Sequence, residues 1–135
     1  MNKFIKNKSI MNQGIIDKYK INFYNSIYEG PVTKIKDIDK IPSTNNKFLT
    51  TFLYSWSRPS DIDELLLPDI ETVLNEKEIE LENGSETIQI IIYLDLVTFY
   101  PEQKDTFSIP TLEFKEIIIG WRDFLLESPL NGTKI

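Results

Sequence analysis

Five carboxylates lie within eleven residues of one another in the middle of the chain. They are Asp61, Asp63, Glu64, Asp69 and Glu71. Oxygen ligands of this kind suit a hard cation such as Mg²⁺. Ser60, however, precedes them in the manner of a hydroxyl cap, and the positive end of a helix favours acidic residues in its first turn. We therefore expect these carboxylates to support a helix that begins near Ser60, and we expect no metal site.

The residue types argue against most enzyme chemistry. The chain has no histidine and no cysteine, which removes His-based proton relays, thiol nucleophiles and thiolate or imidazole ligands for zinc. Pro68-Asp69 and Glu113-Phe-Lys115 imitate a metal-dependent nuclease pattern, but Glu113 and Lys115 fall in a predicted helix, where residues two apart diverge. No glycine-rich phosphate loop and no Gly-x-Ser-x-Gly motif occurs. We expect no enzyme activity and no cofactor.

A run of aromatic residues ends at Trp56, and Arg58 follows two positions later. Alternation along a strand would place Phe48, Phe52 and Trp56 on one face, as in a core. A base-stacking platform is the other interpretation of such a run. Trp56 and Arg58 adjoin a Pro-containing loop and belong to the residue types that dominate binding hot spots. Both are therefore candidate partner-binding residues.

The helix predicted over 111–127 carries a stripe of acidic residues. Its members are Glu113, Glu116, Asp123 and Glu127. Glu78, Glu80 and Glu82 form a second row on one side of a predicted strand. Like charges aligned in this way repel one another. A solvated face and a docking surface both fit the pattern; for docking, the helix acids are the first candidates, and Glu80 and Glu82 are the second.

The charge of −6 is unevenly distributed along the chain. Residues 1–50 hold nine lysines and four acids, a charge of +5, whereas residues 51–135 hold six bases and 17 acids, a charge of −11. Most of the surface would repel nucleic acid, so a basic protein is the expected partner. The first ten residues lack the apolar run of a signal peptide, and no stretch is long enough to cross a membrane. We expect a cytoplasmic protein.

The pattern of apolar residues predicts five strands and three helices. The predicted strands span 18–28, 32–38, 47–56, 78–82 and 86–100. Asn83-Gly84 is a favoured type I′ turn and would join the last two strands. The predicted helices span 60–67, 69–76 and 111–127, and Pro68 must end or kink the first of them. Loops are expected at 42–46 and 101–108.

The order of these elements predicts an α+β fold. We expect a single antiparallel sheet of about five strands, packed against two or three helices. Residues 1–13 are polar and are expected to form a flexible N-terminus, and residues 14–135 are expected to form one domain. No oligomeric state is predicted.

Residues 109–127 start with Ile-Pro and end in Trp-Arg-Asp-Phe-Leu-Leu-Glu. This Pro-initiated amphipathic helix with a Trp-x-x-Phe-Leu ending resembles the C-terminal helix of small bacterial immunity proteins. Those proteins are the antidotes of polymorphic or contact-dependent growth-inhibition toxins. The resemblance implies a non-enzymatic inhibitor that covers the active site of a toxin. Many such toxins are cationic nucleases, and acidic side chains of the antidote stand in for substrate phosphates.

The leading hypothesis is therefore a cytoplasmic immunity protein that binds a basic toxin through its acidic surface. An exposed aromatic side chain such as Trp56 would anchor the complex. The alternative is a carrier of a small or lipid-like molecule, with a cavity between sheet and helices. Gln89, Tyr93 and Asp95 would supply the polar groups of that cavity.

Overall fold

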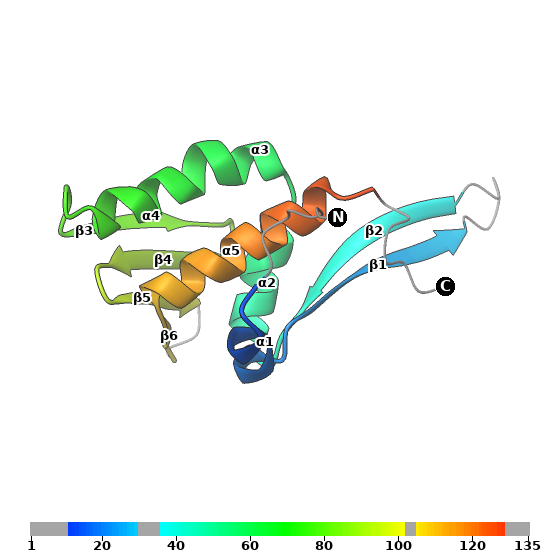
Figure 1. Ribbon diagram of the computed structural model, residues 1–135, viewed down its shortest axis with the longest axis horizontal. Helices are drawn as coiled ribbons and strands as arrows, with labels where there is room; N and C mark the ends of the chain where they lie inside the picture. The colour runs from blue at the N-terminus through cyan, green and yellow to red at the C-terminus, as the bar shows by residue number, and fades with distance from the viewer. Residues whose placement is uncertain (1–10, 30–35, 102–104, 129–135) are drawn as a thin grey trace, which may run out of the picture.

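The computed structural model describes residues 11–29, 36–101 and 105–128. These residues form four helices and two antiparallel sheets, one of two strands and one of four. Figure 1 shows helices packed against the four-stranded sheet, and the two-stranded ribbon extending away on the opposite side. The α+β class is confirmed. The single sheet of about five strands is wrong, because the ribbon and the larger sheet share no strand pairing among the described residues.

The chain enters the fold through a short helix, α1 (Gln13–Tyr19). Asn12 caps it, because its side chain accepts a hydrogen bond of 2.7 Å from the Gly14 N–H. The predicted strand over 18–28 is therefore too long, since α1 includes Lys18 and Tyr19. Of the predicted flexible N-terminus, residues 1–10 lie outside the described residues, whereas Met11 is partly buried against the core.

The two-stranded ribbon follows α1. Its strands β1 (Asn22–Glu29) and β2 (Lys36–Ser43) pair from Asn22↔Ser43 to Glu29↔Lys36. Of the second predicted strand, residues 32–35 lie outside the described residues. The ribbon joins the body through Phe23, whose ring meets Trp121 edge-on at 5.0 Å between ring centres. The base of the ribbon thus rests on the C-terminal helix.

The predicted strand over 47–56 is wrong, because the structure has helix α2 (Lys47–Ser55) there. Asn46 caps this helix, with its side-chain oxygen accepting from the Phe48 and Leu49 N–H groups at 2.9 and 3.1 Å. Leu49, Phe52, Leu53 and Trp56 are buried, which is a helical spacing. Burial of this stripe against the core outweighs the strand propensity of Phe, Thr and Tyr.

A single bent helix replaces the two helices predicted over 60–76. It comprises α3 (Pro59–Asp61), a π-helical turn η2 (Ile62–Leu66) and α4 (Leu67–Leu74). The helix begins at Pro59, and no side chain caps it, so the expected Ser60 cap is not used. Pro68 has no N–H to donate, and the Leu67 N–H bonds to the Ile62 carbonyl in a wider turn. The π-turn thus allows the helix to continue through Pro68.

The four-stranded sheet is a simple meander, β3-β4-β5-β6. Strand β3 (Glu80–Gly84) runs through Asn83 and Gly84, which pair with Ile90 and Gln89 of β4 (Ile88–Tyr93). The predicted type I′ turn at Asn83-Gly84 is therefore wrong, and the reversal occurs at residues 85–87. The Asn83 side chain instead donates to the Leu65 carbonyl and to Asp69, both at 2.9 Å. These bonds tie the edge of the sheet to the bent helix.

The predicted strand over 86–100 is two strands. After β4 the chain turns at Leu94-Asp95 and returns as β5 (Leu96–Pro101). Thr111 holds this turn, because its N–H donates to the Asp95 carbonyl at 3.0 Å and its hydroxyl to the Tyr93 carbonyl at 2.7 Å. Strand β6 (Phe107–Pro110) lies where a loop was expected and pairs with β5.

The long C-terminal helix is confirmed as α5 (Thr111–Leu126). Its inner face buries Phe114, Ile117, Ile118 and Trp121. Rings of Phe52, Phe99 and Phe114 meet with centres 5.5 to 5.8 Å apart, and so join α2, β5 and α5. The buried Trp121 indole donates to the Trp56 carbonyl at 2.8 Å. The core between the sheet and the helices is therefore closely filled.

Candidate functional site

The acids Glu113, Glu116, Asp123 and Glu127 lie along α5 and at its C-terminal cap, and we call them the α5 stripe. The first two of them are occupied by α1. The Glu113 carboxylate accepts from the Tyr19 hydroxyl at 2.6 Å and lies 3.0 Å from the Lys18 ammonium. Glu116 accepts from the Asn12 N–H at 2.5 Å, at the start of α1. Both candidates therefore hold α1 against α5, and they are not free for a partner.

The contact between Glu113 and Tyr19 shifts the pKa values of both side chains. The hydrogen bond from Tyr19, assisted by Lys18, lowers the pKa of Glu113 below its ordinary value of 4.5. Burial, together with the nearby Glu113 charge, raises the pKa of Tyr19. The pair is therefore stable with Glu113 ionised and Tyr19 protonated at neutral pH.

The other two acids of the α5 stripe also have intramolecular contacts. Asp123 lies 3.0 Å from the Arg122 guanidinium, which reaches Asp63 at 2.9 Å as well. Glu127 is the C-terminal cap residue of α5, and its charge opposes the lowering of the Lys40 pKa by burial. The α5 stripe is thus a set of internal contacts along most of its length.

The carboxylates between 61 and 71 are distributed in the same way. Asp63 pairs with Arg122, Glu71 pairs with Lys115, and Asp69 receives the Asn83 side chain. Asp61 lies 3.6 Å from Arg58. No group of three or more acidic side chains within the described ranges is arranged to hold a metal ion. These acids act as fixed partners of side chains on neighbouring elements.

The second-choice candidates, Glu80 and Glu82, are exposed on β3. They pair with Tyr93 and Ile91 across the sheet, so both point away from the buried side that Leu81 shares with Ile92. Hydrogen bonding with Tyr100 chiefly raises the pKa of Tyr93, and the charge of Glu80 adds to it. Neither glutamate forms an ion pair with a described lysine or arginine.

Glu80 belongs to a larger surface at one end of the four-stranded sheet. Exposed aliphatic side chains gather there: Ile79 at 87%, Leu112 at 68%, Leu94 at 48% and Leu96 at 40% of their full exposure. The register explains their proximity, because Glu80 pairs with Tyr93 and Leu96 pairs with Pro110. Exposed acids accompany them, namely Glu76, Glu78, Glu80 and Asp95. We call these eight residues the sheet-end patch.

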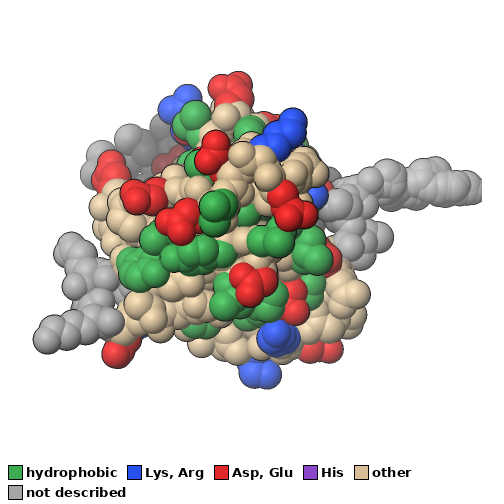
Figure 2. Space-filling model, turned by 90° about the vertical axis from the view of Figure 1, so that its left-hand side faces the viewer, with side chains coloured by type: hydrophobic (Ala, Val, Ile, Leu, Met, Phe, Trp, Pro, Cys, Tyr) green, Lys and Arg blue, Asp and Glu red, His purple; other side chains and the backbone are tan. Residues whose placement is uncertain are grey.

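Figure 2 shows this end of the molecule, where hydrophobic side chains form a band and acidic side chains lie on both sides of it. Lys77 offsets only part of the acidic charge. The patch was not predicted from the sequence, because the strand expected over 86–100 runs through Leu94 and Leu96 without a turn. The available signal was Asp95, a turn-forming residue inside an otherwise apolar run.

Trp56 and Arg58 lie on either side of the connection between α2 and the bent helix. Trp56 is nine-tenths buried, with 9% of its surface exposed, so it is not the exposed anchor that was expected. Its indole N–H has no hydrogen-bond partner among the described residues. Arg58 is exposed, at 77% of its side chain, and its only described ion pair is with Asp61.

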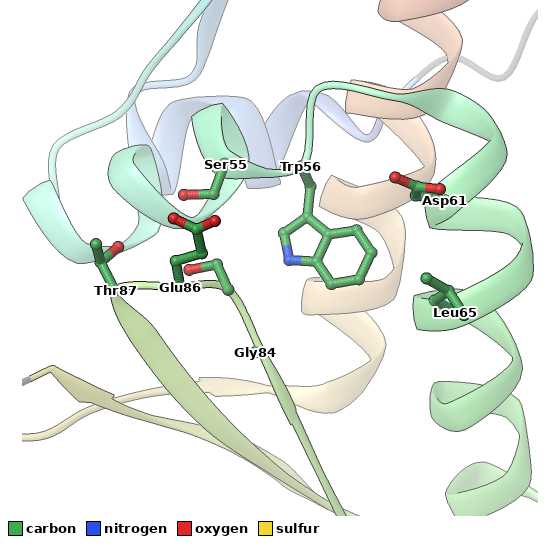
Figure 3. A pocket seen from close by; sticks show the side chains of 8 residues that line it. Ser55, Trp56, Asp61, Leu65, Gly84, Glu86 and Thr87 are labelled. Atoms are coloured by element: carbon green, nitrogen blue, oxygen red, sulfur yellow. The ribbon is translucent and has the colours of Figure 1, made fainter.

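A pocket of about 500 Å³ opens beside Trp56. Its walls come from the end of α2, from the bent helix and from the β3–β4 turn (Figure 3). The lining residues are Ser55, Trp56, Asp61, Leu65, Gly84, Ser85, Glu86 and Thr87. Gln89, Tyr93 and Asp95, the polar groups expected for a ligand cavity, are not among them. We call this hollow the Trp56 pocket.

Comparison of the chain with protein-family models, with curated proteins and with solved structures finds no match. None of the helices in the described part of the chain has the length and apolar character needed to cross a membrane. Two open features of the surface can bind another molecule, the sheet-end patch and the Trp56 pocket.

Proposed function

We propose that this protein is a cytoplasmic inhibitor of the immunity type, which binds a basic toxin and covers its active site. The observation that carries the proposal is the sheet-end patch, where exposed aliphatic side chains lie among acids that pair with no described lysine or arginine. An apolar centre with a charged rim is typical of a protein-docking surface. The negative charge of the sheet-end patch favours a basic partner.

The energetics support the same interpretation. Acids that crowd a surface without cations repel one another, and exposed aliphatic side chains gain nothing from water. A partner with lysines or arginines around an apolar contact would relieve both costs on binding. The acidic field would also speed the encounter, since opposite charges steer association at low salt.

The toxin class we propose is a nuclease. A nuclease active site is built to attract phosphate groups, and carboxylates can occupy the same positive site without being cleaved. The shape of α5, with its proline start and Trp-x-x-Phe-Leu ending, is the feature that resembles immunity proteins. Its acidic stripe contributes less to binding than the sequence suggested, because α1 already contacts Glu113 and Glu116.

The first experiment identifies the partner. The tagged protein is used as bait in an extract of its native host, and a salt gradient releases bound proteins for mass spectrometry. We expect one basic protein, released at high salt in near one-to-one amount, whose toxic activity is blocked by an equimolar amount of the bait. Recovery of no protein partner would contradict the proposal.

The second experiment locates the interface with matched charge reversals. Two single variants, Glu78→Lys and Glu80→Lys, each change the patch. Glu64→Lys makes the same change in charge on the exposed side of the bent helix. We expect the patch variants to slow association at least about fivefold and to weaken its salt dependence. Glu64→Lys should change the rate by less than about twofold. Equal effects at both places would show that only net charge matters.

The alternative, a carrier with a cavity between sheet and helices, has less support. Phe52, Phe99 and Phe114 fill the space between these layers. The observation that favours a ligand is the Trp56 pocket, which lies at the edge of the core and is open to the surface. Its lining is more charged than a lipid-like molecule would require.

A further inference from the structure

The Trp56 pocket has an unsatisfied hydrogen-bond donor in its lining. The Trp56 indole N–H is buried and has no partner among the described residues, whereas the other indole, that of Trp121, donates to the Trp56 carbonyl at 2.8 Å. A buried donor without a partner is unfavourable, because it has lost its hydrogen bond to water. Figure 3 shows the indole nitrogen of Trp56 on the side that faces the β3–β4 turn. The pocket therefore favours an occupant that brings a hydrogen-bond acceptor.

Two carboxylates give the same pocket a negative charge. Asp61 lies on the side of the bent helix and Glu86 on the side of the β3–β4 turn, with Trp56 between them (Figure 3). Glu86 forms no ion pair with a described lysine or arginine, and Asp61 pairs only with the exposed Arg58, at 3.6 Å. The pocket therefore favours a cation.

The two serine hydroxyls of the lining are used by the fold itself. The Ser55 hydroxyl donates to the Thr51 carbonyl at 2.9 Å, and the Ser85 hydroxyl accepts from the Ile88 N–H at 3.2 Å inside the turn. Gly84 is at a φ of 152°, and a Cβ at this position would lie 2.7 Å from the Ile88 carbonyl oxygen. The wall formed by the turn is therefore set by backbone geometry, which leaves Trp56, Asp61, Glu86 and the Thr87 hydroxyl as the groups available to an occupant.

We propose that the Trp56 pocket binds an arginine side chain of a partner protein, together with the main-chain carbonyl of that residue. The guanidinium would lie between Asp61 and Glu86 and beside the indole, since indole is the best aromatic partner of a cation. The carbonyl would accept from the Trp56 N–H. The choice of a protein as the source of the arginine rests on the proposed function, in which the partner is basic.

Arginine fits these groups better than the other occupants do. A free anion would satisfy the indole but would be repelled by Asp61 and Glu86. An apolar molecule would leave the indole unsatisfied and both carboxylates partly desolvated. A lysine would supply the charge, but its ammonium cannot reach two carboxylates through a planar fork. The arginine and its own carbonyl satisfy all three groups at once.

The test needs no partner, because the chain has two tryptophans and therefore two indole N–H signals. The ¹⁵N-labelled protein is titrated with N-acetyl-L-arginine amide, a blocked arginine that keeps its carbonyl groups. N-acetyl-L-glutamine amide, which has the same backbone without the charge, is the control. We expect a saturable shift of the Trp56 signal, a smaller one of the Trp121 signal, and little effect of the glutamine probe.

Variants locate the binding. Glu86→Gln and Asp61→Asn should each weaken binding of the arginine probe about twofold to fivefold, and Glu82→Gln, an exposed acid outside the pocket, should leave it unchanged. Arg58→Gln should strengthen binding, because it removes the cation that competes for Asp61. The Trp56 signal is assigned with Trp56→Phe or, where that variant does not fold, from its contacts in a three-dimensional spectrum.

Three results would overturn the inference. The first is an absent response of Trp56 to the arginine probe, and the second is an equal response to the glutamine probe. The third is binding of free arginine but not of the blocked amide, which would indicate a small-molecule site. The proposed function is tested separately: loss of toxin binding in Glu78→Lys but not in Asp61→Asn or Glu86→Gln would keep the sheet-end patch and remove the arginine anchor.

Discussion

Two acidic regions of this chain look alike in sequence and have different roles in the structure. On the α5 stripe, Glu113 and Glu116 accept hydrogen bonds from α1, and Asp123 pairs with Arg122. On the sheet-end patch, Glu78 and Glu80 are exposed and pair with no described lysine or arginine. The first region holds two helices together, and the second is left without a cationic partner among the described residues.

The difference shows that the charge of a row of acids is available to a partner only where the fold leaves it unneutralised. A carboxylate that already has its donors gains little from a new cation, because binding would replace one good contact with another. A carboxylate among like charges gains more, because a cation removes repulsion. Substitutions at matched positions in the two regions test this difference.

The largest effect is expected from reversing charge on the α5 stripe. Glu113→Lys with Glu116→Lys removes the acceptors of Tyr19 and Asn12 and places new cations beside Lys18. We expect a loss of about 2–3 kcal/mol in the free energy of unfolding, measured by urea denaturation. The matched variant, Glu78→Lys with Glu80→Lys, should change it by less than about 0.5 kcal/mol. Similar losses in both would remove the distinction between the two regions.

A smaller effect with a defined pH dependence is expected from Glu113→Gln. The pKa of Glu113 in the folded chain lies below its ordinary 4.5, so its ionised form contributes stability at neutral pH. The substitution should cost about 1 kcal/mol above about pH 5.5. This difference should shrink as the pH falls through the lowered pKa, because the wild-type carboxyl then takes up a proton. Thermal unfolding of both proteins across acidic pH measures it, and a constant difference would contradict the assignment.

The smallest effect should have the opposite sign. Glu80 and Glu82 lie on the same side of β3 without a described cation beside either. Glu82→Gln removes their repulsion and should raise the free energy of unfolding by about 0.2–0.5 kcal/mol. Replicate urea unfolding curves can resolve this change. A loss of stability would mean that Glu82 has a favourable contact within the fold.

Helix α5 illustrates what local pattern can predict. Its bounds, its proline start and its inner face of Phe114, Ile117, Ile118 and Trp121 follow from helical spacing alone. The α+β class follows from the mixture of such a helix with alternating segments. These features were predictable because each is encoded within one run of residues.

Helix α2 and the Leu94-Asp95 turn illustrate the opposite case. The composition of residues 47–56 favours a strand, and only the Asn46 cap and burial against Phe99 and Phe114 make it a helix. The reversal at Leu94-Asp95 is held by Thr111, a residue from another element. Contacts that come from a distant part of the chain leave no periodic signal near the residues they control.

The sequence by itself determined the acidic balance, the absence of histidine and cysteine chemistry, and the long amphipathic helix. Composition and periodicity are properties of the chain, so they persist in any fold. Only the tertiary structure decided which acids are neutralised, because Tyr19 meets Glu113 and Arg122 meets Asp63 across long separations in sequence. It also decided that Trp56 is buried in a pocket between Asp61 and Glu86, with no described residue accepting from its N–H, because three separate segments form that pocket.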